Sequence, residues 1–205
     1  MNTANRSALG FLEMKGAACG VTAVDVAVKA AYIESLQAKV ACPGKFIVLI
    51  AGEMAAVETA VAAAKAVVGS GIYDSCLLGR VHPALYWGLY DQFSYPLQEE
   101  SRSSRRKNES LGIVETLSIA AGLASADAGL KSAAVDLKEL RLGYALGGRS
   151  YFVFSGNTSD VEAALRSAAK VATQRGSLGS QALIPKPAEG LKRLFGDSRF
   201  HLPTI

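Results

Sequence analysis

The chain begins its first apolar segment with Leu9-Gly10-Phe11-Leu12-Glu13, and a close copy, Leu111-Gly112-Ile113-Val114-Glu115, follows 102 residues later. When the alignment is continued at this offset over residues 9–34 and 111–136, the two copies share eight identities in 26 aligned pairs. Beyond the first motif, the shared residues include Gly20/Gly122, Asp25/Asp127 and Lys29/Lys131. Self-similarity at a fixed offset predicts a chain built from two related units.

A second aligned block pairs residues 44–62 with 148–166, at an offset of 104. The second copy therefore has two extra residues between the counterparts of Glu34 and Gly44. A polar stretch near Asp91–Glu109, rich in Ser and Arg, joins the copies, and this composition is typical of an exposed connection. We predict a first domain over residues 1–95 and a second over residues 108–205.

Each copy alternates short apolar runs with longer segments of helical spacing. In the first copy we predict strands at Leu9–Met14, Ser35–Ala41, Phe46–Ala51 and Ile72–Leu78, and helices at Ala17–Ala31 and Glu53–Val68. In the second copy, Ser159–Glu162 has the pattern of a capping box at a helix start, and Ser180–Ile184 is the last strand. The order β-α-β-β-α-β predicts an α/β fold, an α+β sandwich in which both domains are ferredoxin-like. That fold hosts many functions, so it does not decide this one.

The composition is that of a folded chain rich in small side chains. Of 205 residues, half are hydrophobic and only 7% are aromatic, with 34 Ala and 20 Gly. The high hydrophobic content excludes a disordered chain. The absence of a Gly-X-Y period excludes collagen, and the absence of sustained heptads excludes a coiled coil. The N-terminus lacks the apolar segment of a signal peptide, and the strongly apolar runs are shorter than the roughly 20 residues of a membrane span. We expect a soluble, cytosolic protein without a membrane partner.

Charge and motif content argue against nucleic-acid binding and against catalysis. The net charge is only +4, and glutamates dilute the one dense basic cluster, at residues 102–107. A solvated linker is therefore favoured there over a polyanion site. The chain has no GxSxG, P-loop or Rossmann motif, and its two distant histidines do not make a zinc site. We expect no enzyme activity.

The three cysteines include no CxxC pair, which argues against a disulfide framework. We expect Cys19 and Cys76 to act as small buried hydrophobes, the common behaviour of free cysteine. Cys42 lies in the predicted turn, where Pro43 restricts it to extended geometry and Gly44 permits a tight reversal. From these residues alone an ordinary hairpin is the simpler interpretation, because an iron–sulfur cluster needs several thiolates.

Four features together resemble the bacterial microcompartment shell domain: Ala8–Glu13, the helix with Asp25 and Lys29, the run Phe46–Gly52, and the Pro-rich end Ile184–Pro187. The resemblance covers nearly the whole chain, twice over, in the unpermuted strand order. It implies a tandem-domain shell protein that forms a pseudohexameric homotrimer. Such a trimer would tile with other shell proteins in the shell of a microcompartment in the bacterial cytoplasm.

The turn Ala41–Phe46 resembles the pore loop of the iron–sulfur tandem shell subunits of propanediol-utilisation microcompartments. In those subunits the loop cysteines of three chains ligate a [4Fe-4S] cluster on the threefold axis. The resemblance therefore implies one cluster per trimer, held by three copies of Cys42, and a lumenal or cytosolic redox enzyme as a partner. The second copy has a longer loop without cysteine. The implied pore residues are Pro43, Gly44, Lys45, Leu146, Gly147 and Gly148, with Lys45 expected close to the cluster.

The resemblance also implies that Lys29, Lys131 and Lys186 lie where neighbouring tiles meet. For the first two lysines, the alternative role is simple pairing with the negative end of a helix dipole. Two alternative functions stay open. One is a shell tile with an open metabolite pore and no cluster, and the other is a ferredoxin-like regulatory trimer that binds a small molecule and builds no shell.

Overall fold

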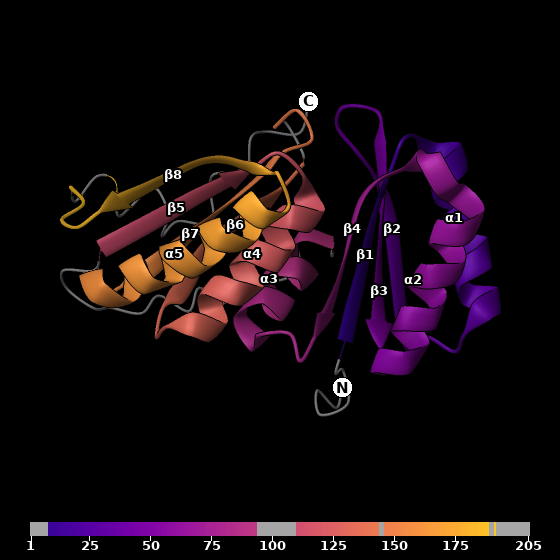
Figure 1. The fold of residues 1–205 in the computed structure, drawn as a ribbon, viewed down its shortest axis with the longest axis horizontal. Coiled ribbons are helices and arrows are strands. Elements are labelled where there is room, and N and C mark those ends of the chain that lie inside the picture. Colours follow the sequence, from indigo (N-terminus) through magenta and orange to yellow (C-terminus); the bar gives the residue numbers. More distant parts are fainter. Residues whose placement is uncertain (1–7, 94–109, 144–145, 189–190, 192–205) are drawn as a thin grey trace.

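The computed structural model describes residues 8–93, 110–143, 146–188 and 191, and it contains both predicted copies (Figure 1). The first copy consists of β1 (Ala8–Met14), α1 (Ala17–Ala30), β2 (Ser35–Ala41), β3 (Lys45–Gly52), α2 (Met54–Val68), a 3-10 turn (Gly69–Gly71) and β4 (Ile72–Gly79). After α3 (Pro83–Phe93), the second copy consists of β5 (Ser110–Thr116), α4 (Ile119–Ser132), β6 (Asp136–Leu142), β7 (Ser150–Gly156), α5 (Thr158–Gln174) and β8 (Leu178–Ile184). The predicted order of elements is confirmed in both copies.

Each copy forms a four-stranded antiparallel sheet, with the strand orders β2-β3-β1-β4 and β6-β7-β5-β8. The pairing of β1 with β3 and β4 matches that of β5 with β7 and β8, whereas β6 pairs with β7 through a register shift between Leu137 and Glu139 that the β2–β3 pairing lacks. Glu13 lies opposite Asp74 in the first sheet, and Glu115 lies opposite Ser180 in the second. In both sheets the register shifts directly after this glutamate. Positions on β1, β3 and β4 can therefore be assigned their counterparts on β5, β7 and β8.

Two local predictions are wrong. The capping box at Ser159–Glu162 is not the start of α5, because this helix begins at Thr158 after an N-cap at Asn157. The Asn157 backbone is extended, as usual for an N-cap, so Ser159 already lies in the first helical turn. The linker was also placed too early, since α3 extends to Phe93. The rest of that polar stretch, residues 94–109, lies outside the described residues.

The core of the first domain lies between one face of its sheet and the helices α1 and α2. Its strand residues include Leu12, Met14, Val48 and Ile50, and its helix residues are mostly alanines. Gly20 shows why small residues are needed, since a Cβ there would lie 2.0 Å from Cδ1 of Phe46. The Ala- and Gly-rich composition therefore reflects helices that lie close against a sheet.

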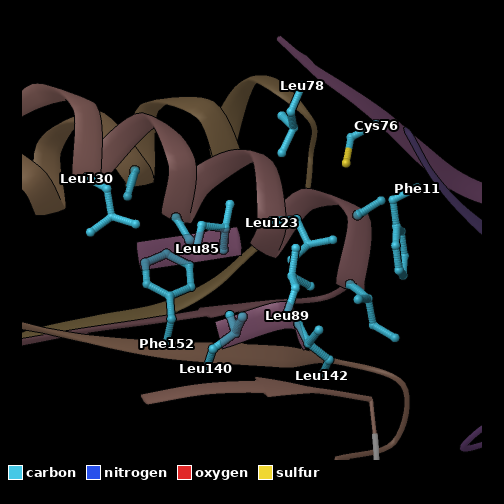
Figure 2. Packing of buried hydrophobic residues seen from close by; sticks show 14 of the residues in the cluster. Phe11, Cys76, Leu78, Leu85, Leu89, Leu123, Leu130, Leu140, Leu142 and Phe152 are labelled. Atoms are coloured by element: carbon cyan, nitrogen blue, oxygen red, sulfur yellow. The ribbon is translucent and has the colours of Figure 1, made fainter. Parts of the chain in front are cut away.

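The second core extends across both domains, because α4 lies between the two sheets (Figure 1). This helix packs on α5 and β7 of its own domain and on β4 and β1 of the first. Figure 2 shows Leu123 of α4 between Phe11 and Cys76 on one side and Phe152 on the other. The two domains thus share one continuous hydrophobic cluster.

Helix α3 follows the first copy in sequence but packs on β6 and α4 of the second. Its buried face is formed by Leu85 and Leu89, which are at most 1% exposed. We expected Tyr86, Trp87 and Tyr90 to cover a core edge; Tyr86 is half-buried, and the side chains of the other two are not described.

One segment, Met54–Gly71, is by length and composition apolar enough to cross a membrane. This segment is longer than the strongly apolar runs noted in the sequence, because it also contains the charged residues Glu58 and Lys65. Val57, Ala60 and Ala64 bury one face of this helix against the first sheet. The segment is a core helix of a folded domain.

Candidate functional site: paired loops at the domain junction

Cys42 lies at the tip of the β2–β3 hairpin. The strands pair as far as Ala41 and Lys45, so Cys42, Pro43 and Gly44 form the turn, and all three are exposed. Gly44 has φ 64°, the left-handed conformation that glycine adopts without strain, and the Cys42–Pro43 peptide bond is cis. The hairpin thus presents one free cysteine at its surface.

The longer loop of the second domain lies directly beside this hairpin. Lys45 donates a hydrogen bond from Nζ to the carbonyl oxygen of Gly148 at 3.1 Å. A Cβ on Gly148 would lie 2.8 Å from Lys45 Nζ and 3.1 Å from the Cys42 carbonyl oxygen, and its φ is 77°. Gly147 is exposed and Leu146 half-buried, while residues 144 and 145 are outside the described residues. The two loops predicted to form one pore are therefore neighbours within a single chain.

The Lys45 side chain points into the domain junction and is only 9% exposed. Its Nζ lies 2.5 Å from Glu13 Oε1 and 3.6 Å from the centroid of the Tyr73 ring. We expected this charge to lie close to the cluster held by Cys42. The structure pairs it with Glu13 of its own domain, while its hydrogen bond to the Gly148 carbonyl oxygen reaches the second domain.

Glu13 is the centre of this junction and is fully buried. Its Oε2 accepts hydrogen bonds from the backbone N–H groups of Ile119 at 3.0 Å and Ala120 at 3.3 Å, in the first turn of α4. A carboxylate at a helix N-terminus is stabilised by the helix dipole. Burial nevertheless raises the pKa of Glu13, against the opposing effects of Lys45 and these two N–H groups.

A second carboxylate of the first domain also holds the start of α4. Asp74 accepts a hydrogen bond from the hydroxyl of Ser118, the N-cap residue of α4, and forms an ion pair with Arg175 at 2.7 Å. Arg175 further donates to the carbonyl oxygen of Ser75 at 2.6 Å. These three contacts hold the start of α4 and the end of α5 against β4 of the first sheet.

Sequence reasoning missed this junction. The identity of Glu13 and Glu115 was visible, and a glutamate repeated inside an apolar strand could have signalled a buried charge that needs a partner. Nothing local in the sequence indicated that Asp74, Ser118 and Arg175 meet, because they lie 44 and 101 residues apart.

The three predicted edge lysines occupy different surroundings. Lys29 is exposed at the end of α1 and pairs with Asp25 at 2.7 Å. Lys131 pairs with Asp127 and also donates to the carbonyl oxygen of Gly79 in the first domain. Lys186 is exposed after β8. Their role at tile edges stays a prediction.

The cysteines differ in their surroundings. Cys76 is buried, and burial raises the pKa of its thiol to about 12, whereas Cys19 is half-buried and Cys42 exposed. The expected structural role of Cys76 is consistent with this burial.

In cluster-free protein, alkylation by iodoacetamide is expected to modify Cys42 first, because the reactive form is an accessible thiolate. Cys76 should react only after unfolding. Mass spectrometry of peptides from a time course measures this order. Modification of Cys76 in folded protein at the rate of Cys42 would contradict the buried position.

Among the described residues of one chain, no group of three or more His, Cys, Asp or Glu side chains could hold a metal. Cys42 supplies one exposed thiolate, a ligand type that iron–sulfur clusters use.

Comparison with known proteins identifies the family. The BMC domain model matches residues 8–81 and 110–187. The chain is 32% identical over 186 residues to the bacterial microcompartment shell protein PduT of Citrobacter freundii, covering 91% of this chain and 96% of that protein.

Solved structures agree with this match. A microcompartment protein from Desulfitobacterium hafniense DCB has a TM-score of 0.74 and 36% identity, with 92% of this chain and 99% of that chain covered. The fused permuted hexameric shell protein MSM0275 of the RMM microcompartment has a TM-score of 0.53, 18% identity and 81% coverage of both chains, so it supports the fold alone. The chain therefore belongs to the bacterial microcompartment shell proteins, as a tandem-domain member of the shell in the bacterial cytoplasm.

Proposed function

We propose that three copies of this chain form a pseudohexameric shell tile whose central pore holds a [4Fe-4S] cluster through three Cys42 thiolates. The tile would conduct electrons between the lumen and the cytosol, to or from a redox enzyme on one side of the shell. The observation that carries the proposal is the position of exposed Cys42 beside the pore loop of the second domain.

The way the two domains pack supports a closed ring. The helix α4 of one domain packs on the outer face of the other domain's sheet, so the contact joins two different surfaces. Contacts of this head-to-tail kind generate rings when the rotation between units closes. Because Cys42 and Gly148 are neighbours at this contact, a ring that repeats it would gather all six loops around one axis.

The donor chemistry suits a cluster shared among chains. One cysteine per chain cannot hold an iron–sulfur cluster, but three equivalent thiolates at an axis would supply three of the four usual ligands. The fourth iron would remain open to water or another ligand. When bound, such a cluster supplies one-electron storage. The chain's own contributions are the thiolate of Cys42, the tight turn that Gly44 allows with its positive φ, and the close approach of the second loop that Gly148 allows because it has no side chain.

Anaerobic purification of the wild type and of Cys42→Ser tests the cluster. The wild type is expected to contain four iron and four sulfide ions per three chains, with an EPR signal after reduction. Cys42→Ser is expected to lose both ions and the signal. Cys19→Ser is the matched control, because Cys19 is half-buried with its Sγ beside Gly71 and is not part of the exposed hairpin turn, and it should keep the iron.

An iron-free, colourless wild type, even after reconstitution with iron and sulfide, would contradict the cluster. If such a protein still forms trimers and tiles, the open metabolite pore becomes the preferred function. The family assignment already favours either shell function over a regulatory trimer, because relatives of this chain are shell proteins.

A further inference from the structure

The side chain of Lys45 is a buried cation held by three separate segments of the chain. Its Nζ lies 2.5 Å from Oε1 of Glu13 on β1 and 3.6 Å from the centroid of the Tyr73 ring on β4. It also donates to the Gly148 carbonyl oxygen of the second domain at 3.1 Å. A buried lysine with three partners keeps one position, whereas an exposed lysine samples many rotamers.

Glu13 anchors this lysine to the second domain. Both carboxylate oxygens are engaged, Oε1 by Lys45 and Oε2 by the backbone N–H groups of Ile119 and Ala120 at 3.0 and 3.3 Å. A path of polar contacts therefore runs from the first turn of α4 through Glu13 and Lys45 to the Gly148 carbonyl oxygen. That oxygen is tied to the packed junction of the two domains as well as to its own loop.

Gly148 is the residue at which the second loop meets the Cys42 turn. It is buried with φ 77°, and a Cβ there would lie 2.8 Å from Lys45 Nζ and 3.1 Å from the Cys42 carbonyl oxygen. Its counterpart Gly44 also has a positive φ, yet it is exposed, and the space around a Cβ there is open within the described part of the chain. A turn of this conformation does not require a close neighbour, so the contact is specific to this pair of loops.

The second copy places its own basic residue differently. Arg149 is the counterpart of Lys45, and Glu115 is the counterpart of Glu13. In the single chain this second pair is 3.3 Å apart, and its side chains are 52% and 35% exposed, whereas the first pair is buried. Breaking a surface pair changes little, but removing one partner of a buried pair leaves polar groups without compensation. The first pair is therefore the one that can hold a loop in place.

We infer that Lys45 is a positioning residue of the proposed pore, which holds the second-domain loop, residues 146–149, against the Cys42 turn and closes one side of that turn to solvent. Without the Nζ donor the buried Gly148 carbonyl oxygen loses its hydrogen bond to the first domain, which favours movement of the loop toward water. The effect on a cluster rests on the proposed function, because solvent exposure is one of the factors that set the potential of an iron–sulfur cluster.

Hydrogen exchange of the cluster-free protein tests whether Lys45 holds the loop. The double variant Glu13→Gln with Lys45→Met replaces both buried charges, so neither is left alone. The amides of Gly143 and Arg149, bonded within the loop at 2.8 and 3.2 Å, are expected to exchange about tenfold faster than in the wild type. Lys65→Met, with an exposed lysine on α2, is the matched control and should leave these amides unchanged. Lys45→Met alone is the second variant, with the same expected change if the double variant does not fold.

Loss of visible absorbance in air, measured on anaerobically loaded protein, tests the shielding of the cluster. The double variant is expected to bleach about tenfold faster than the wild type, in proportion to the opening of the loop. Its midpoint potential, from an EPR-monitored titration, should rise, because solvent stabilises the more negative reduced cluster and the replaced pair carries no net charge. Urea unfolding of both proteins shows whether stability is matched, and with matched stability neither change comes from unfolding.

The results distinguish this role of Lys45 from the cluster itself. Unchanged exchange of the loop amides in the double variant overturns the positioning role, whether or not the wild type binds iron. Faster exchange with wild-type bleaching and wild-type potential overturns the shielding of the cluster. An iron-free wild type overturns the proposed function, and the exchange measurement then decides the positioning role by itself.

Discussion

Replacing Glu13 with Ala is expected to lower the free energy of unfolding by about 3–5 kcal/mol, the usual cost of leaving one charge of a buried pair alone. Lys45 would remain in the junction at 9% exposure without its carboxylate. The first turn of α4 would also lose the acceptor for two N–H groups. Urea unfolding at one fixed protein concentration measures the loss, because the stability of an oligomer depends on concentration.

The double variant Glu13→Gln with Lys45→Met is expected to recover most of this loss. Gln keeps an acceptor for the α4 N–H groups, and Met fills the space of the lysine stem without a charge. Burial raises the pKa of Glu13, so the ionised pair itself is costly to bury, and replacing both charges removes that cost. Glu115→Ala is the control: its side chain is 35% exposed in the chain, and it should change unfolding of the isolated chain by less than about 1 kcal/mol. A Glu13→Ala chain as stable as the wild type would contradict the role of this pair.

The double variant Lys29→Ala with Lys131→Ala is expected to lose two-dimensional sheet formation while its trimers stay intact. Both lysines end the corresponding helices, and the family resemblance implies that this position faces a neighbouring tile. Lys29 has the simpler surroundings, because its side chain is 71% exposed and, within the part of the chain that the structure describes, it forms one ion pair, with Asp25 on the same helix. Electron microscopy of assembled sheets, with sedimentation of the soluble fraction, measures both properties.

The two lysines allow a finer comparison. Lys131 donates to Gly79 across the domain junction, so Lys131→Ala also removes one partly exposed hydrogen bond, worth about 0.5–1.5 kcal/mol. Lys29→Ala alone should weaken sheets without changing chain stability. Lys65→Ala, on α2, is the control and should leave sheets unchanged. Loss of the trimer in the Lys29 variant would count against the edge role and would favour a role in the subunit contact.

Much of the architecture is predictable because it is encoded locally. The repeated motifs, the helical spacing around Gly20 and Gly122, and the strand order follow from patterns within about 85 residues. The position of Cys42 in a turn is equally local, since Pro43 restricts the residue before it and Gly44 permits the tight reversal. The start of α5 was predicted wrongly for a local reason as well: Asn157 and Ser159 are both suitable N-caps, and composition alone does not choose between them.

The junction was not predictable from such patterns. Glu13 meets α4 across 106 residues, and Asp74 meets Arg175 across 101. The partners of Lys45 were equally hidden, because Glu13 and the Gly148 carbonyl oxygen lie 32 and 103 residues away from it in the chain. Helix α3 likewise follows the first copy and packs on the second.

By itself, the sequence determined that this protein has two copies of one shell domain and a single cysteine at the tip of one loop. Repeats, periodicity and turn residues act over short stretches of chain, so they can be recognised without coordinates. Only the tertiary structure decided how the copies meet: α4 on the first sheet, Glu13 at its N-terminus, and the two loops side by side. These contacts join residues far apart in the chain. The buried carboxylate of Glu13 is hydrogen-bonded to α4 only when both domains are folded and packed together.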